Sequence, residues 1–200
     1  MAQFGGPKLV KKLHFDQEAK NKLVEGINKI AAAVSSTLGA SGRTVVIEDD
    51  FGNPYVTKDG VTVANSIMLN DTVENLGVSM VKQAAQQTAN MAGDGTTTSI
   101  VLTQAIIRCY HKLKASEHSF RDVKSGINKF KDHVLKLLQD KTIKIDDKKL
   151  DDVSIISTNN DVKLGTLIAD AFRQAGENGI VTMETSSTSD TYVDVVEGTR

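Results

Sequence analysis

Three consecutive stretches of the sequence carry apolar residues at the spacing of long amphipathic helices. They cover residues 72–92, 96–115 and 119–139, and in each of them apolar positions recur every three or four residues. Only two prolines, Pro7 and Pro54, occur in the 200 residues, and neither lies in these stretches. Because proline is the strongest helix breaker, long helices are permitted. Helices of this length pack side by side, so the sequence predicts a mainly α fold built on an elongated bundle.

The residues before this bundle include extended segments. Residues 8–15 are half-polar, as in an edge strand protected by lysines. Asp16 is a favourable N-cap for a helix that we expect to end at Gly39. Residues 44–57 are rich in β-branched residues around a Gly-Asn turn, which predicts a β-hairpin.

A charged, weakly periodic segment at residues 141–152 separates the bundle from a second region. We interpret this segment as a domain boundary, and the alternative is a solvated connection between two helices. After it, the pattern predicts a small α/β unit of two short helices followed by two strands. These elements are expected at residues 147–157, 161–175, 179–185 and 190–197.

The composition excludes several classes of function. A formal net charge of −1 gives the chain no basic field for nucleic acid, and no apolar run approaches the roughly 20 residues that span a bilayer. Residues 1–13 lack the apolar core and cleavage site of a signal peptide. The single cysteine, Cys109, excludes an internal disulfide and fits a reducing compartment. We therefore expect a cytoplasmic protein that binds neither nucleic acid nor membrane, with Cys109 as a buried, inert thiol.

The segment Gly93-Asp94-Gly95-Thr96-Thr97-Thr98 connects two of the predicted long helices. The start of a helix offers unpaired N–H groups and the positive end of the helix dipole, so it attracts anions. A carboxylate in the same turn repels a bare phosphate but suits a divalent cation bound between the two. The segment therefore predicts a site for a metal–nucleotide phosphate. The alternative is structural, with Asp94 as an N-cap, Gly93 ending the preceding helix and the threonines at the surface.

Two further turns carry residues that suit the same ligand. The segment Thr37-Leu38-Gly39-Ala40-Ser41-Gly42 has two glycines that let the backbone approach a ligand, and the alternative is a helix C-cap followed by a tight turn. In Thr57-Lys58-Asp59-Gly60, Lys58 can contact phosphate and Asp59 can orient or deprotonate a water molecule. The alternative there is an ordinary Asp-Gly turn. The sequence has no Walker-type loop and its four histidines are scattered, so we expect neither a P-loop fold nor a histidine metal site.

Taken in order, the three turns closely resemble the nucleotide-site motifs of the group I chaperonins, the bacterial, organellar and phage type. The matching segments are Thr-Leu-Gly-x-x-Gly-Arg at 37–43, Thr-Lys-Asp-Gly-Val at 57–61 and Ala-Gly-Asp-Gly-Thr-Thr-Thr at 92–98. Residues 176–183 and 193–198 resemble the intermediate domain of the same family. Because these segments occur in order and at plausible spacing, the resemblance is highly specific.

The resemblance implies an order of domains. Residues 1–141 would form the N-terminal part of the equatorial domain, a helical bundle that binds ATP and makes the ring contacts. Residues 142–198 would form the N-terminal part of the intermediate domain, which is a hinge. Residues 199–200 would begin the apical domain, which binds unfolded protein and the co-chaperonin.

The resemblance also implies roles for the residues at matching positions. Asp94 would hold Mg²⁺, Asp59 would assist hydrolysis of ATP, and Lys58 would lie beside the phosphates. The backbone at Thr37 and Lys58 would be available to K⁺. The remaining contacts to the nucleotide and its phosphates would come from Thr37, Leu38, Gly39, Ala40, Gly95, Thr96, Thr97 and Thr98.

The sequence departs from the family pattern at several points. Ala40-Ser41 replaces the usual Pro-Lys, which implies a looser loop and one basic contact fewer. The N-terminal arm is longer than usual, and the segment 141–152 is more charged. The family's second catalytic aspartate and its base and ribose contacts belong to returning segments that are absent from these 200 residues. We therefore expect this chain alone to hydrolyse ATP weakly or not at all, and the full-length protein to be an ATPase.

These observations lead to one main hypothesis and one alternative. We expect a subunit of an ATP-dependent folding chaperonin that binds unfolded clients, works with a co-chaperonin and assembles into a ring, heptameric by family resemblance. The alternative is a non-catalytic assembly protein that keeps the chaperonin fold and docks to chaperonin rings by strand addition. Binding of Mg-ATP distinguishes the two.

Overall fold

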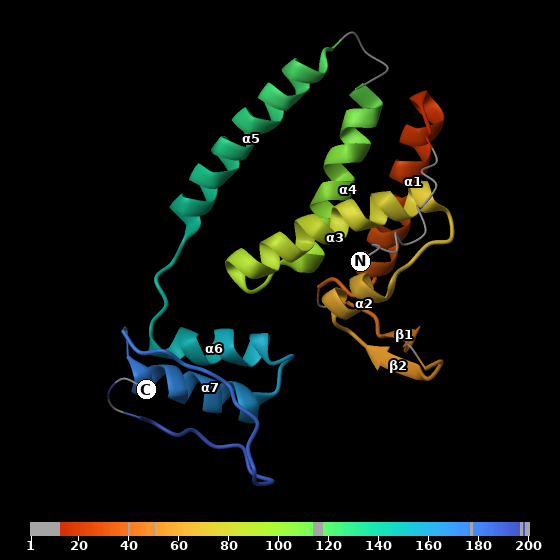
Figure 1. Ribbon diagram of the computed structural model, residues 1–200. Coiled ribbons are helices and arrows are strands. Elements are labelled where there is room, and N and C mark those ends of the chain that lie inside the picture. Colours follow the sequence, from red (N-terminus) through yellow and green to blue (C-terminus); the bar gives the residue numbers. More distant parts are fainter. Residues whose placement is uncertain are drawn as a thin grey trace, which may run out of the picture. The chain divides into compact units, whose positions relative to one another are not determined.

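The computed structural model describes residues 13–39, 41–49, 51–113, 118–176, 178–196 and 198. Within these ranges the chain forms seven helices and one two-stranded antiparallel sheet, which confirms the mainly α prediction (Figure 1). The elements are α1 (Asp16–Ser35), β1 (Val45–Glu48), β2 (Pro54–Thr57), α2 (Gly60–Ser66), α3 (Thr72–Ala92), α4 (Thr96–Leu113), α5 (Phe120–Lys141), α6 (Asp147–Ser157) and α7 (Val162–Ala175).

Contacts divide the chain into two compact units, Met1–Gly126 and Ile127–Arg200. Helix α5 begins in the first unit and ends in the second. The first unit contains the three predicted ligand turns, and α6 and α7 pack together in the second. The division of the chain into equatorial and intermediate domains at residues 141 and 142 stays a prediction.

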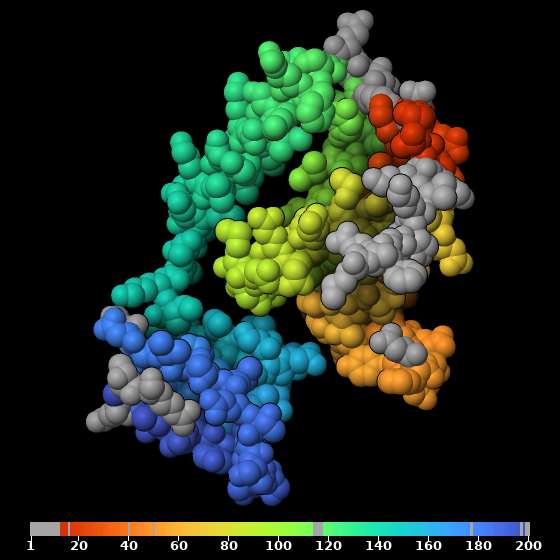
Figure 2. Space-filling model, in the orientation of Figure 1, coloured from red at the N-terminus to blue at the C-terminus, as the bar shows by residue number. Residues whose placement is uncertain are grey.

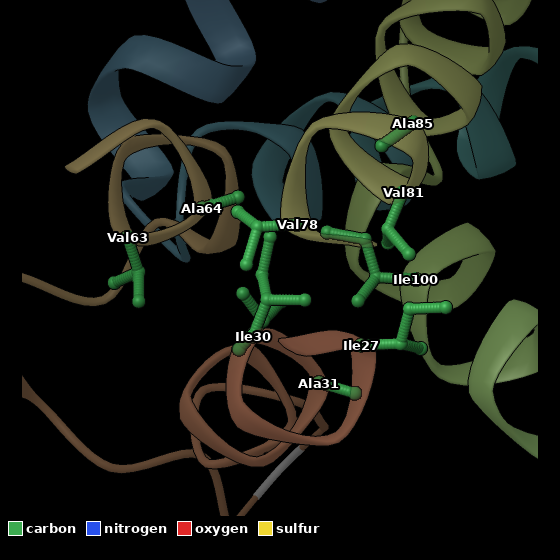
Figure 3. Packing of buried hydrophobic residues seen from close by; sticks show 10 residues of the cluster. Ile27, Ile30, Ala31, Val63, Ala64, Val78, Val81, Ala85 and Ile100 are labelled. Carbon is green, nitrogen blue, oxygen red and sulfur yellow. The ribbon is translucent and has the colours of Figure 1, made fainter. Parts of the chain in front are cut away.

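The core of the first unit is aliphatic and lies where α1, α2, α3 and α4 meet. Side chains from the four helices point toward one another in Figure 3. Ile30, Val34 and Ile100 have no exposed surface at all. The buried cluster consists of Ile27, Ile30, Ala31, Val34, Val63, Ala64, Val78, Val81, Ala85 and Ile100. Burial of this many branched side chains supplies the main driving force for assembling the turns at the helix ends.

Two glycines let α1 and α3 approach closely. A Cβ atom on Gly26 would collide with the carbonyl group of Glu74, and a Cβ on Gly77 would collide with the carbonyl oxygen of Leu23. The two contacts are reciprocal, because each helix contributes one glycine and one backbone carbonyl. Backbone packed this tightly leaves no room for a side chain at either position.

Two ion pairs at the surface also link α1 to the N-terminal part of α3. The Lys22 ammonium lies 2.7 Å from a carboxylate oxygen of Asp71, which is the N-cap of α3. The Lys29 ammonium lies 2.6 Å from a carboxylate oxygen of Glu74. The hydrogen bond from Lys22, together with two from backbone N–H groups of α3, lowers the pKa of Asp71 to about 2.

Helix α1 differs from its predicted bounds at both ends. The N-cap position is Phe15, and Asp16 is the first helical residue. The helix ends at Ser35 rather than at Gly39, because the chain turns back on itself there. The hydroxyl of Thr37 donates to the carbonyl of Val34 at 2.8 Å, and the turn closes with a 2.7 Å bond from the Arg43 N–H to the Ser36 carbonyl.

The β-hairpin is confirmed, with Val45 opposite Thr57 and Glu48 opposite Pro54. Its turn is held by Asp49, whose carboxylate accepts hydrogen bonds from the Phe51 and Asn53 N–H groups at 2.9 and 2.7 Å. In the space-filling view the hairpin (orange) lies at the surface of the first unit (Figure 2). Helix α2, which follows the hairpin, was not predicted.

The second unit confirms the two predicted helices but not the two strands. Helices α6 and α7 pack so closely that a Cβ on Gly165 would lie 2.5 Å from the Cα of Ile155. Residues 179–185 and 190–196 form no strand, and residue 197 lies outside the described residues. A β-ladder needs a hydrogen-bonded partner, and the described residues place none beside these segments. The prediction of strands there is therefore wrong for this structure.

Two expectations of burial are also wrong. Cys109 is exposed rather than buried, and α5 has no buried residue although one of its faces is apolar. Of the predicted N-terminal strand, residues 13–15 are irregular and the rest lies outside the described residues. Among the described helices, none is long and apolar enough to cross a membrane.

Candidate functional site

The three predicted ligand turns meet at Gly60. This residue begins α2, while Thr37 follows α1 and Thr97 lies in the first turn of α4. A Cβ atom on Gly60 would collide with the Thr97 hydroxyl and would lie 3.2 Å from the Thr37 hydroxyl oxygen. One residue of each turn therefore takes part in a single contact, although the turns are up to 60 positions apart in the sequence.

Four hydrogen bonds hold Asp59 in place. Its N–H donates to the Thr57 hydroxyl at 3.0 Å, and Thr57 is itself 92% buried, with only 8% of its surface exposed. The Asp59 carboxylate accepts hydrogen bonds from the N–H of Val61 at 3.2 Å and the N–H of Thr62 at 2.9 Å. The Thr62 hydroxyl donates to the same carboxylate at 2.6 Å. Asp59 is thus the N-cap of α2, with its position fixed.

These hydrogen bonds also set the charge of Asp59. Partial burial raises the pKa of its carboxyl group, but the bonds from the Thr62 hydroxyl, the Thr62 N–H and the Val61 N–H outweigh this, and the net pKa is lowered. The carboxylate is therefore ionised at neutral pH. An ionised, immobile carboxylate can accept a hydrogen bond from water, which is the property that the proposed hydrolytic role needs.

Lys58 lies beside Asp59 and its side chain is exposed. Its ammonium forms no ion pair with any residue that the structure describes. A flexible, unpaired ammonium next to a fixed carboxylate can reach an anionic ligand without breaking an existing contact.

The acidic turn between α3 and α4 uses two glycines in the left-handed conformation, Gly93 with φ +75° and Gly95 with φ +90°. Gly93 ends α3 by donating its N–H to the Ala89 carbonyl at 2.8 Å. Among the residues that the structure describes, the Asp94 carboxylate accepts only the N–H of Gly95, at 2.5 Å, and the residue is exposed. Because α4 begins at Thr96, Gly95 and not Asp94 occupies the N-cap position. The alternative in which Asp94 caps α4 does not hold.

The three threonines of the turn have different surroundings. Thr96 is buried, Thr97 is half-buried against Gly60, and Thr98 is exposed. Their N–H groups lie in the first turn of α4, where a helix provides no acceptors of its own. Ser99 is the first residue whose N–H bonds back to this turn, at 2.8 Å from the Gly95 carbonyl. The N–H groups of Thr96, Thr97 and Thr98 therefore have no acceptor among the described residues and are available to an anion.

An open depression of about 500 Å³ lies beside the acidic turn. The end of α3 and one face of α4 form its walls. Its lining is mainly apolar and includes one carboxylate and several hydroxyl groups. The lining residues are Thr88, Ala92, Asp94, Gly95, Thr98, Ser99, Leu102, Thr103 and Ile106. The size is compatible with the volume of a small-molecule ligand.

The first turn is compact at Gly42 and open at Gly39. A Cβ on Gly42 would collide with the Thr37 carbonyl, whereas Gly39, with φ +76°, has open space around it. Leu38 is exposed. The predicted ligand residue Ala40 lies outside the described residues. The carbonyl groups of Thr37 and Lys58, predicted to face K⁺, accept no hydrogen bond from another described residue.

The residues present fit a magnesium ion bound together with phosphate. Within the described ranges, no three His, Cys, Asp or Glu side chains gather in a metal cluster. Mg²⁺ in nucleotide sites is usually held by one or two carboxylates, with phosphate oxygens and water completing its octahedron. Asp94 offers one exposed carboxylate with unused lone pairs beside the free N–H groups of α4, and this suits such an arrangement.

Two residues that shape this site have no role assigned from the sequence: Thr57 is named only as a member of its turn, and Thr62 is not named. Thr57 and Thr62 hold Asp59 in place. The signal for Thr62 was present in the order Asp59-Gly60-Val61-Thr62, in which Asp59 is a favourable N-cap and Thr62 lies three positions after it.

Residues 30–199 match the model of the TCP-1/cpn60 chaperonin family. The chain belongs to this family. The resemblance found in the sequence is thereby confirmed, and chaperonins of this family are in general ATPases that use ATP and Mg²⁺.

Individual chaperonins agree with this assignment. Chaperonin GroEL 1 of Rhodopirellula baltica is 43% identical over 193 residues, which cover 95% of this chain and 34% of that protein. The crystal structure of chaperonin gp146 from bacteriophage EL 2 (Pseudomonas aeruginosa), obtained in the presence of ATP-BeFx, matches with a TM-score of 0.66 and 31% identity. That match covers 77% of this chain and 27% of gp146.

A group III chaperonin in the open state matches with a TM-score of 0.64 and 26% identity, over 78% of this chain and 31% of the other. This chaperonin chain therefore spans between 27% and 34% of the length of these relatives.

Proposed function

We propose that this chain is the N-terminal part of an ATP-driven protein-folding chaperonin subunit and that its first unit binds Mg-ATP. The observation that supports this most directly is the meeting of three turns at Gly60, next to a fixed carboxylate and the free N–H groups of α4. A phosphate chain lying across this junction would contact all three turns.

In this proposal, Asp94 holds Mg²⁺ and the ion bridges to the phosphates. The N–H groups of Thr96, Thr97 and Thr98 bind phosphate oxygens at the positive end of α4. Gly95, whose N–H donates to the Asp94 carboxylate, lies beside the phosphates. Lys58 adds a positive charge that neutralises the phosphates. The backbone of Thr37, Leu38, Gly39 and Ala40 contacts the nucleotide, and the carbonyls of Thr37 and Lys58 face K⁺.

Asp59 assists hydrolysis by orienting the attacking water. Its ionised carboxylate is a hydrogen-bond acceptor, but three donors of its own helix already occupy it, and a carboxylate with a lowered pKa is a weak base. Asp59 alone therefore supports only slow turnover. Rapid hydrolysis requires a second carboxylate from the rest of the full-length subunit.

The whole protein, in this proposal, forms a ring and works in the cytoplasm. ATP binding shifts the orientation of the intermediate hinge, and the motion reaches an apical domain that binds unfolded clients and a co-chaperonin. A ligand shifts such an equilibrium only by its differential affinity for the two states.

The test compares ATP hydrolysis by the full-length protein and by its Asp94→Ala variant. Loss of the metal carboxylate is expected to lower the rate by about 100-fold or more, the scale of removing one strong transition-state electrostatic contact. Asp140→Ala, which removes an exposed carboxylate of α5, serves as the matched control and should leave the rate unchanged. Equal rates for wild type and Asp94→Ala would refute the metal role.

The alternative function, a non-catalytic protein that docks to chaperonin rings, is favoured by one observation. Within the described ranges the hairpin sheet has two strands, and no further described strand pairs with either edge. Val46 and Val56 are 65% and 60% exposed. Such an edge can receive a strand from a partner. Absence of a calorimetric signal with millimolar Mg-ATP, together with binding to chaperonin rings, would support this alternative.

A further inference from the structure

The C-terminal end of α2 is held by a lysine from a different helix. Lys82, in the middle of α3, donates its ammonium to the carbonyl oxygen of Asn65 at 2.9 Å and to that of Ile67 at 2.7 Å. The last carbonyls of a helix carry its negative dipole end and have no N–H partners within the helix. A cation placed there satisfies both carbonyls and opposes the dipole.

Helix α2 transmits this anchoring to the candidate site because it is short. It contains seven residues, and Val63 and Ala64 in its middle are 1% and 3% exposed. Asp59 caps its first turn, and Gly60 is its first residue. A helix of two turns that is pinned in the core moves as one body, so a displacement at its C-terminal end also displaces its N-terminal end.

Lys82 also lies close to the other helix of the site. A narrow cleft of about 40 Å³ between α2, α3 and α4 is lined by Lys82 together with Val61 and Thr96. Val61 donates its N–H to Asp59, and Thr96 begins α4 beside the acidic turn. Burial lowers the pKa of Lys82, so the ammonium is kept in this cleft against a desolvation cost, with two backbone carbonyls as compensation.

We propose that Lys82 is a positioning residue for ATP hydrolysis, which sets the location of Asp59 by anchoring α2 from its opposite end. The inference rests on the proposed function for its catalytic consequence. It goes beyond it in assigning a role to a side chain that belongs to none of the three ligand turns. Lys82 does not touch the ligand and acts through Asp59.

The first test measures kcat and KM of full-length protein with Lys82→Met, which keeps the apolar stem and removes the ammonium. A displaced Asp59 is expected to lower kcat by about 10- to 100-fold, since misplacement by about 1 Å costs up to that factor. The KM for ATP should change much less, because the N–H groups of α4 are retained. Lys82→Arg, which keeps donors for both carbonyls, should recover most of kcat.

Lys29→Met is the matched control, because Lys29 also links two helices, but its ion-pair partner, Glu74, lies on α3 and not on α2. Its kcat should stay within about twofold of wild type, the scale of an exposed ion pair. An equal loss of kcat in Lys29→Met and Lys82→Met would mean that any weakening of the first unit suffices. That outcome would overturn the positioning role.

The second test does not depend on hydrolysis. Hydrogen exchange of the Val61 and Thr62 N–H groups reports whether they still donate to Asp59. Exchange at these two positions should be faster in full-length Lys82→Met than in wild type, and unchanged in Lys29→Met. A wild-type protein without ATPase activity would refute the proposed function, whereas unchanged exchange at both positions in Lys82→Met would refute the inference about Lys82.

Discussion

Replacement of Gly77 by alanine tests whether the close crossing of α1 and α3 determines the stability of the first unit. Gly77 is buried in the interior of α3, and the Cβ added by the substitution would collide with the Leu23 carbonyl oxygen. It would also lie 3.1 and 3.3 Å from the carbonyl carbon and Cα of Leu23. All three atoms are backbone, so no side chain can rotate away, and α1 must move as a whole.

Two opposing effects decide the size of the change. Alanine is favoured over glycine in a helix interior by about 1 kcal/mol. Overpacking a core costs about 1–3 kcal/mol, and the upper end applies here because the obstructing atoms are backbone. Movement of α1 also loosens the packing of Ile27 and Ile30 against α3. We therefore expect a net loss of about 2 kcal/mol of unfolding free energy, or a Tm lower by about 4–8 °C for a protein of this size.

Urea unfolding followed by far-UV circular dichroism measures this change, with a constant m-value showing that the same transition is observed. Gly126→Ala is the matched control, because Gly126 lies within α5 and a Cβ there would meet no atom within 4 Å. That control should gain up to about 1 kcal/mol from helix propensity alone. If Gly77→Ala is stabilised as much as Gly126→Ala, the two helices do not approach as closely as the structure shows.

Three further outcomes are expected. Asp71 has its pKa lowered to about 2 by Lys22 and by N–H groups of α3, so its contribution to stability is complete above its ordinary pKa and is lost as the pH falls from about 4 to 2; acid unfolding of Asp71→Asn should lack this component. Ile100→Ala empties a fully buried position and should cost about 2–5 kcal/mol in denaturant unfolding. Gly60→Ala would force the Thr97 hydroxyl aside and should weaken Mg-ATP binding in calorimetry by about 10-fold, while wild-type affinity in this variant would contradict the proposed junction.

Long helices were predictable from the sequence because their signal is repeated many times. In α3 the apolar positions recur through 21 residues, and its predicted bounds agree with the structure at both ends. Helix α2 was missed because seven residues hold too few repeats of the 3.6-residue period to stand out. Its start was signalled only by Asp59, and Asp59-Gly60 is equally typical of an ordinary turn.

Predictions that depended on a partner surface fared worse than those that depended on local pattern. An apolar stripe says that a helix face suits burial, but it does not say what covers the face, and both Cys109 and the apolar side of α5 are exposed. The same limit applies to residues 179–185 and 190–196, whose β-branched composition favours strands only where a ladder partner is present. Local propensity is therefore a weaker guide wherever the decisive contact lies outside the segment itself.

The candidate site shows the opposite case, in which locally ambiguous turns gain meaning from their juxtaposition. Each turn alone fits an ordinary capping role, and Asp59 does cap α2. The glycine after it is explained by the fold, because only a residue without Cβ fits against the Thr97 and Thr37 hydroxyls. Since a cap needs no such contact with two distant turns, the close fit at Gly60 is the feature that a purely structural role for these residues does not explain. In the proposed function, a ligand that spans all three turns would explain it, because close approach of the turns would bring the fixed carboxylate of Asp59 and the N–H groups of α4 to the same molecule.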